Sequence, residues 1–266
     1  MMFGLTLLTL IGVCAVFGGW LGPFDPNKMD FLATFQPPGA RHWLGTDNFG
    51  RDVLSRLLAG AAVSIRVALI SVSLATVAGV SIGTLAGFYG RWLDEVLMRL
   101  MDIIMAFPAL LLAITVMAIL GRGVENAMIA IAVVYTPIFA RITRASILTI
   151  REAEFVTAAR ALGQRDLFLM ARHVLPNALG PIIVQTSLSL AFAVLAEAAL
   201  SFFGLGTQPP ASSWGLMLAD GRSYLLQAPW LGIFPGIAIL LTVLSFNLVG
   251  DGLRDLLDPR MRQVLR

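Results

Sequence analysis

The chain has 266 residues, of which 58% are hydrophobic and only 13% are charged, and its mean hydropathy is +0.83. Soluble domains carry roughly a quarter charged residues, so this composition excludes a water-soluble globular domain and requires a large lipid-facing surface. The net charge of +3 comes almost wholly from scattered arginines, which argues against nucleic-acid binding. Cys14 is the only cysteine, so no disulfide forms within the chain.

Six apolar segments come close to the length of a membrane span, at residues 2–21, 67–89, 103–120, 123–140, 182–203 and 230–250. A helix needs about 20 apolar residues to cross a bilayer, because lipid offers no hydrogen-bond partners for the backbone. We therefore predict an all-α integral membrane protein with six transmembrane helices. The fourth helix contains Pro137 and is expected to continue toward Ile150, because Arg141 and Arg144 can snorkel to the interface.

The first apolar segment is predicted to be a transmembrane anchor within residues 1–22. A cleaved signal peptide is the alternative. No basic residue precedes the apolar run, however, and its length suits a full span better than a signal core.

Residues 23–66 form the first polar stretch, which is rich in Pro and Gly at its start. After Gly50 the pattern becomes helical, with one apolar face formed by Val53, Leu54, Leu57 and Leu58. We therefore predict an external loop that ends in an amphipathic helix lying along the interface before the second span. Its role is open between a plain connection and a contact on the substrate side.

Small residues recur every four positions in the second predicted span, at Ala75, Gly79, Gly83 and Gly87. Such a smooth stripe lets another helix approach closely. The stripe therefore indicates helix packing, with the partner helix either in this chain or in another subunit.

Residues 151–177 form a second polar stretch, between the fourth and fifth spans, and are predicted to contain two short helices separated at Gly163. Glycine ends a helix readily because it adopts the left-handed conformation without steric cost. Pro176 fits the start of the next membrane helix, where a missing backbone donor does no harm. The loop carries more apolar surface than a connection needs, and such surface usually has a partner.

Residues 204–229 form the third polar stretch, which is rich in Gly, Pro and Trp and is predicted to fold back between the last two spans. Most arginines lie in 151–177, near residues 91–99 and near the C-terminus, so the positive-inside rule places these segments in the cytoplasm. Both termini are therefore predicted to be cytoplasmic, with 259–266 as a cytoplasmic tail and 204–229 outside.

The loop at 151–177 resembles the EAA loop of bacterial ABC-importer permeases. Ala158 and Ala159 are followed by Gly163 and then by Leu175-Pro176, with the spacing of that loop. Four further blocks resemble the dipeptide/oligopeptide/nickel permease family, and more narrowly its C-type subunit; they lie at residues 42–56, 98–114, 196–206 and 246–260. The resemblance implies a type I permease fold, with the permease transmembrane domain over 67–258. The short uncharged N-terminus differs from the longer basic tail common in the family, which leaves open a start further upstream.

In that family the loop forms coupling helices that dock into a cleft on a separate ATPase subunit. The resemblance therefore implies ATPase-coupling residues at Thr157, Ala158, Ala159, Arg160, Gly163, Arg165, Leu175 and Pro176. Thr157 stands where the family has glutamate, which removes a direct salt bridge from that position. His173 stands where the family has an aliphatic residue.

The resemblance also implies partners: a B-type permease as the other half of a heterodimer, two ATP-binding subunits and an extracytoplasmic solute-binding protein, all at the inner membrane. ATP and Mg²⁺ are expected on the partner ATPases. The only lysine is Lys28, so the chain has no phosphate-binding loop ending in Lys and Ser or Thr. No catalytic residue, cofactor or metal is expected in this chain. Dipeptides and oligopeptides are the expected substrates, and nickel or another small solute is the alternative.

Two other classes of protein have less support in the sequence than a permease subunit. An intramembrane enzyme lacks support, because His42 and His173 are the only histidines and fall on opposite sides of the predicted membrane. An ion-coupled carrier needs buried ionisable residues along its path. Glu197 in the fifth span is the candidate for such a residue. Four roles are open for it: lining the translocation path, binding a substrate amine, pairing with a partner permease, or making a structural hydrogen bond to a neighbouring helix. Asp102 is expected to pair with Arg99 or Arg141.

Overall fold

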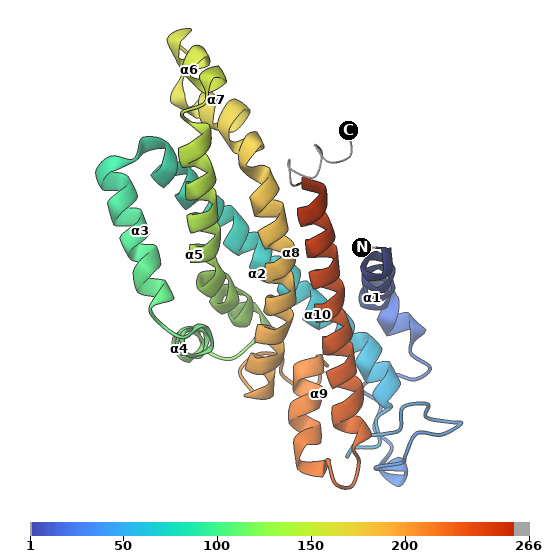
Figure 1. Cartoon of the computed structure of the whole chain (residues 1–266). Coiled ribbons are helices and arrows are strands. Elements are labelled where there is room, and N and C mark those ends of the chain that lie inside the picture. The colour runs from blue at the N-terminus through green and yellow to red at the C-terminus, as the bar shows by residue number, and fades with distance from the viewer. Residues whose placement is uncertain (1, 258–266) are drawn as a thin grey trace.

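Long helices joined by short loops make up most of residues 2–257, the part of the chain that this computed structural model describes (Figure 1). The α-helices are α1 (Met2–Leu21), α2 (Val53–Tyr89), α3 (Arg91–Met105), α4 (Ala109–Leu120), α5 (Val124–Ile150), α6 (Glu154–Ala161), α7 (Asp166–Leu169), α8 (Leu175–Phe202), α9 (Trp214–Gly221) and α10 (Trp230–Leu257). Short helical turns are η1 (Phe31–Ala33), η2 (Met170–Val174) and η3 (Arg222–Tyr224). The predicted tail at 259–266 lies outside the described residues.

The number of spans agrees with the all-α prediction. Five helices are long and apolar enough to cross a membrane, and the bent pair α3 and α4 makes a sixth if the pair is one span. α5 runs through Pro137 to Ile150 without a break, so the predicted continuation of the fourth helix is confirmed.

The predicted boundary between an external amphipathic helix and the second span is wrong. α2 is one helix of 37 residues from Val53 to Tyr89, with no break near residue 66. Asp52 caps its first turn by accepting a hydrogen bond from the Ser55 backbone N–H at 2.8 Å. Ser55 and Arg56 are buried, because their polar groups contact other parts of this chain. The polar residues of this segment therefore mark buried contacts and not a water-facing surface.

The third predicted span is also not a single helix. α3 and α4 meet at an angle of 94° across the break that contains Phe107 and Pro108. Proline disfavours the helical conformation in the residue before it and has no backbone N–H to continue the helix. The apolar composition of residues 103–120 therefore predicts that this segment lies in the membrane, but it does not predict that the helix axis turns within the segment.

The small-residue stripe of α2 packs inside this chain, against α5. A Cβ at Gly79 would lie 2.5 Å from the Phe139 Cβ, and one at Gly87 would lie 2.9 Å from the Ile147 Cβ. Only glycine allows the two helix backbones to approach this closely. Of the two packing partners left open by the sequence, the structure shows the internal one.

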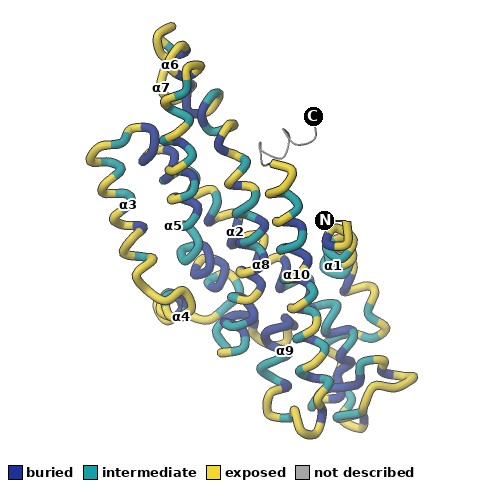
Figure 2. The backbone as a smooth tube through the Cα atoms, viewed as in Figure 1, coloured by how far each residue is buried: buried dark blue, intermediate teal, exposed yellow. Residues whose placement is uncertain are grey.

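The helices form a bundle whose two ends differ (Figure 1). At one end α6 and α7 project beyond the other helices, and at the other end α9 lies beside the loop of residues 22–52; we name these the α6 end and the α9 end. α2, α5, α8 and α10 lie side by side between them. Buried residues concentrate along these central helices, whereas α1, α3 and α4 are largely exposed (Figure 2).

Candidate functional site

The loop between α5 and α8 begins with α6, which ends at Gly163 as predicted. Gly163 has φ +77°, in the left-handed region, and a Cβ there would meet no atom within 4 Å. Glycine is therefore needed for the backbone conformation and not for space. The Gln164 backbone N–H donates to the Ala159 carbonyl at 3.3 Å, and the Gly163 N–H donates to the Arg160 carbonyl at 2.9 Å, which closes the helix end.

The second short helix predicted in the loop is not separate from the next membrane helix. A π turn (Met170–Val174) joins α7 to α8, so the helix from Asp166 to Phe202 is continuous. Pro176 lies in the first turn of the part assigned to α8, as predicted. The wider π turn accommodates the missing N–H of proline without ending the helix. α7 therefore leads directly along α8 into the bundle.

One face of this loop is buried and the other is free. Val156, Ala159, Leu169 and Val174 are buried against the bundle and hold the loop in place. On the other side large apolar side chains are exposed at Phe155, Leu162, Leu167 and Phe168, with Leu162 at 83% and Leu167 at 75%. We name these four residues the outward face of the loop. Figures 1 and 2 show that it projects beyond the remaining helices at the α6 end.

The eight residues predicted from the resemblance divide between the two sides of the loop. Thr157, Ala158, Arg160, Gly163, Arg165 and Pro176 are exposed, Ala159 is buried and Leu175 is half-buried. Ala159 therefore packs against the bundle in this structure. A role of the remaining residues in contacting an ATPase stays a prediction.

Charged side chains brace the base of the loop. Arg151 donates to the Gly87 carbonyl at 2.7 Å, at the end of α2, and Arg160 lies over the Phe88 ring at 5.6 Å. About two helix turns before the loop, Arg144 of α5 binds both carboxylate oxygens of Asp94 in α3. Asp102 pairs with Arg141, which is one of its two predicted partners. The loop is thus attached to α2 as well as to α5 and α8, and α3 is attached to α5.

Glu197 is enclosed by the fold and is 1% exposed. Its carboxylate accepts hydrogen bonds from the hydroxyls of Ser64 in α2 at 3.0 Å and of Ser201, one turn further along α8, at 2.8 Å. The Thr207 hydroxyl lies 3.4 Å from the same carboxylate. The structure therefore shows the structural hydrogen bond among the alternatives for Glu197, and this side chain does not open onto a surface of the described chain.

Two hollows on the sides of α8 were not foreseen from the sequence. One, of about 220 Å³, lies between α4, α5 and α8, and Tyr135 is the polar residue among its lining side chains. The other, of about 450 Å³, lies between α8 and α10 and includes Asn247. Leu195 lines both, so the hollows flank the same stretch of α8. The side chains that line these hollows are mostly apolar, as are those that face lipid. The sequence therefore does not distinguish the two kinds of position.

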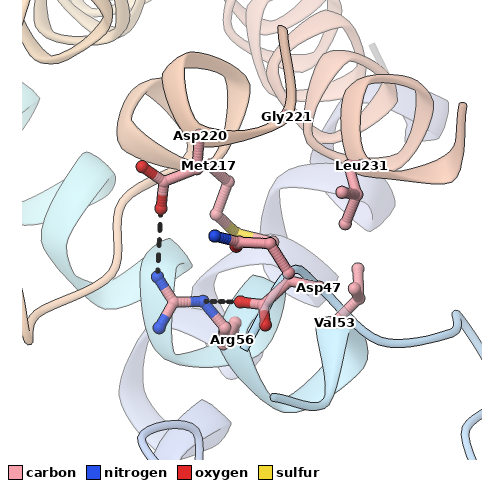
Figure 3. A pocket seen from close by; sticks show the side chains of 8 residues that line it. Asp47, Val53, Arg56, Met217, Asp220, Gly221 and Leu231 are labelled. Carbon is pink, nitrogen blue, oxygen red and sulfur yellow. Dashed lines mark ion pairs between the residues drawn. The ribbon is translucent and has the colours of Figure 1, made fainter. Parts of the chain in front are cut away.

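A buried charge cluster at the α9 end was also not foreseen. Arg51 binds Asp47 at 2.6 Å. Arg56 lies 3.7 Å from Asp47 and 3.9 Å from Asp220 of α9 (Figure 3). The arginines and Asp47 are nearly fully buried, whereas Asp220 is partly exposed. Burial raises the pKa of Asp220, and the nearby arginines oppose this shift. The cluster ties the loop before α2 to α9.

A second buried pair supports the start of α2. His42 lies 2.8 Å from the Asp52 carboxylate, and the Ser55 hydroxyl donates to the same carboxylate at 2.8 Å. His42 belongs to the loop of residues 22–52 at the α9 end, and His173 belongs to the π turn that follows α7, so the two histidines lie at opposite ends of the bundle. Across residues 2–257, no three His, Cys, Asp or Glu side chains are grouped to hold a metal ion.

A bundle of helices long and apolar enough to cross a membrane, with a helical loop projecting at one end, defines a multi-pass membrane protein. The chain belongs to the family of binding-protein-dependent transport system inner membrane components, whose model matches residues 79–263. The model of the N-terminal transmembrane domain of oligopeptide transport permease C matches residues 1–38. The resemblance to a C-type permease is thus confirmed.

Individual relatives span nearly the whole chain. It is 46% identical to the dipeptide transport system permease protein DppC of Alkalihalophilus pseudofirmus, over 97% of this chain and 85% of the relative. It is 48% identical to the di/tripeptide transport system permease protein DppC of Pseudomonas aeruginosa, over 97% and 88%. It is 42% identical to the glutathione transport system permease protein GsiD of Pectobacterium atrosepticum, over 97% and 86%.

Solved structures support the same fold. A structure of the MetNI methionine ABC transporter, in an inward-facing conformation, aligns with a TM-score of 0.63 at 18% identity, covering 76% of this chain and 96% of that one. An amino acid ABC transporter aligns with a TM-score of 0.56 at 15% identity, covering 75% and 92%. At these identities the likeness shows the type I importer permease fold alone. With the family match, it makes this chain a permease subunit of an ABC importer.

Proposed function

We propose that this chain is the C-type permease of an importer that carries dipeptides or oligopeptides across the inner membrane. In this proposal it pairs with a B-type permease, two ATP-binding subunits drive it, and an extracytoplasmic solute-binding protein delivers the solute. The observation that carries the coupling role is the outward face of the loop, where four large apolar side chains are exposed on a braced helical projection. A projection of this kind at the end of a membrane bundle is suited to a water-soluble partner.

The peptide substrate is supported by the relatives. Those named for dipeptides and for di- or tripeptides share 46% and 48% of their residues with this chain, and one named for glutathione shares 42%. Nickel or another small solute is the alternative. Uptake of radiolabelled dipeptides and of nickel by cells that express the complete transporter separates the two, and nickel uptake without peptide uptake contradicts the proposal.

The coupling mechanism follows from the continuity of the helices. In this proposal the partner ATPases bind ATP and Mg²⁺. Lys28 is the only lysine of this chain, and it is not part of a phosphate-binding loop. When the ATPases close on ATP, they carry the outward face with them. The helix from Asp166 to Phe202 transmits that displacement, because it continues from the loop into the bundle without a break. The bundle then alternates between a conformation open to one side of the membrane and a conformation open to the other side.

The orientation proposed from the arginines places the α6 end and both termini in the cytoplasm and the α9 end outside. Cys14→Ser provides a cysteine-free background, because Cys14 is the only cysteine. In that background, Arg160→Cys and Gln208→Cys introduce exposed thiols at the two ends. A membrane-impermeant maleimide added to intact cells is expected to label Gln208→Cys alone. Labelling of Arg160→Cys from outside contradicts the orientation and the coupling role with it.

A substitution that introduces a charge on the outward face tests whether this face binds the ATPase subunits. Leu167→Asp is expected to remove the ATPase subunits from the affinity-purified complex and to abolish uptake, because it places a carboxylate inside an apolar contact. Leu226→Asp is the matched control, since Leu226 is a fully exposed leucine at the α9 end. The control is expected to retain the ATPases. Retention of the ATPases by Leu167→Asp contradicts the proposed docking surface.

A further inference from the structure

α1 touches the rest of the bundle closely at two glycines. A Cβ at Gly4 would lie 2.7 Å from the Leu248 Cβ of α10, and one at Gly18 would overlap the backbone of Leu58 in α2. These glycines are the only buried residues of α1 among those described. They are about 21 Å apart along the helix at 1.5 Å per residue. α1 is therefore held near its two ends, by two different helices.

Between these contacts Ile11 and Cys14 of α1 pack against the core, and α1, α2 and α10 together line a hollow of about 200 Å³. The lining residues that matter here are Ile11 and Cys14 from α1, Leu58 and Ala61 from α2, and Phe234 and Leu241 from α10. Trp214 also lines the hollow, but its indole N–H already donates to the Leu57 carbonyl at 3.0 Å. The hollow thus offers almost no hydrogen-bonding group to an occupant.

The apolar lining and the volume of the hollow limit which molecules can occupy it. Water needs two or more polar partners in a buried site and finds none here. A further protein helix does not fit, because one helical turn with its side chains fills roughly 400 Å³ at a diameter of 10 Å or more. The hollow lies between membrane-spanning helices, so its surroundings are lipid tails. A tail is thin, flexible and wholly apolar.

We propose that this hollow is a binding site for one acyl chain of a membrane lipid. The bound tail fills the space between the two glycine contacts and adds to the apolar contacts that α1 already makes with the core. α1 and the tail then form one packed layer on α2 and α10. The proposal is independent of which solute the transporter carries.

The test uses the complete transporter in nanodiscs that contain a phospholipid with a photoreactive diazirine in its acyl chain. After illumination, mass spectrometry of the digested protein locates the adducts. Adducts are expected on the α1, α2 and α10 peptides around Cys14, Leu58 and Leu241. Adducts confined to the exposed side of α1, or a chemical cross-link from Cys14 to another subunit, overturn the proposal.

Matched variants decide whether the hollow itself holds the tail. Cys14→Phe fills the hollow from α1, and Val16→Phe adds the same side chain at a position that is 74% exposed. Cys14→Phe is expected to lower the adduct yield on α2 and α10 several-fold, with no change in Val16→Phe. Cys14→Leu, which fills the space less and perturbs folding less, is expected to give an intermediate yield. Equal yields in the wild type, Cys14→Leu and Cys14→Phe overturn the proposal.

Discussion

Ser64 of α2 donates a hydrogen bond of 3.0 Å to Glu197 of α8, across 133 positions of the sequence. The same serine hydroxyl accepts a hydrogen bond from the Trp214 backbone N–H of α9 at 3.3 Å. One buried serine therefore connects two spanning helices with the short helix at the α9 end. This connection explains why a single carboxylate is kept in an apolar span without being part of an ion relay.

Glu197→Ala is expected to lower the free energy of unfolding by about 1–3 kcal/mol, because it leaves the Ser64 and Ser201 hydroxyls buried without their acceptor. Glu197→Gln keeps an acceptor oxygen and is expected to cost less. Thermal unfolding of the purified complex measures both. If instead uptake is lost in Glu197→Gln while the unfolding temperature is unchanged, Glu197 acts on the solute and the structural role is insufficient.

Arg51→Ala is expected to destabilise the α9 end by about 3–5 kcal/mol, because it leaves Asp47 buried with only the more distant Arg56 as a counter-charge. Arg41→Ala is the control. Arg41 is 69% exposed and its ion pair with Asp30 is 3.9 Å long, so its loss is expected to cost about 0–1 kcal/mol. Hydrogen exchange of the α9 peptides reports the difference. Equal protection in the two variants contradicts a stabilising role for the cluster.

Gly163→Val is expected to uncouple ATP hydrolysis from uptake while the complex still inserts in the membrane. A β-branched residue is strained at φ +77°, so the end of α6 shifts although no neighbouring atom blocks the side chain. Gly163→Asn is the control, since asparagine tolerates this conformation better. The ratio of solute transported to ATP hydrolysed in proteoliposomes is the measurement. Normal uptake in Gly163→Val refutes the coupling role of this turn.

Gly83→Val is expected to prevent assembly of the α2 and α5 pair. Its Cβ would overlap the Ala140 carbonyl, and a backbone atom cannot rotate away as a side chain can. Gly12→Val makes the matching change in α1, where a Cβ meets nothing within 4 Å. Yield and unfolding temperature in detergent are expected to fall sharply in Gly83→Val alone. A stable Gly83→Val protein shows that the two helices can separate without loss of the fold.

The sequence by itself determined the class of protein and the local features. Apolar length set the spans because each span faces the same lipid, and Gly163 set the end of α6 because its backbone conformation is a local property. The spacing of Ala158, Ala159 and Gly163 marked the loop that projects at the α6 end.

Only the tertiary structure decided what depends on distant partners. The pattern after Gly50 predicted a separate helix at the interface, but the Arg56 side chain pairs with Asp47 and Asp220 inside the fold. Pro108 accounts for the break between α3 and α4, but the 94° angle across it and the hollow beside α1 depend on how neighbouring helices pack. Apolar side chains that face lipid and those that face a protein hollow have the same chemistry, so the sequence does not separate them, whereas the positions of the helices do.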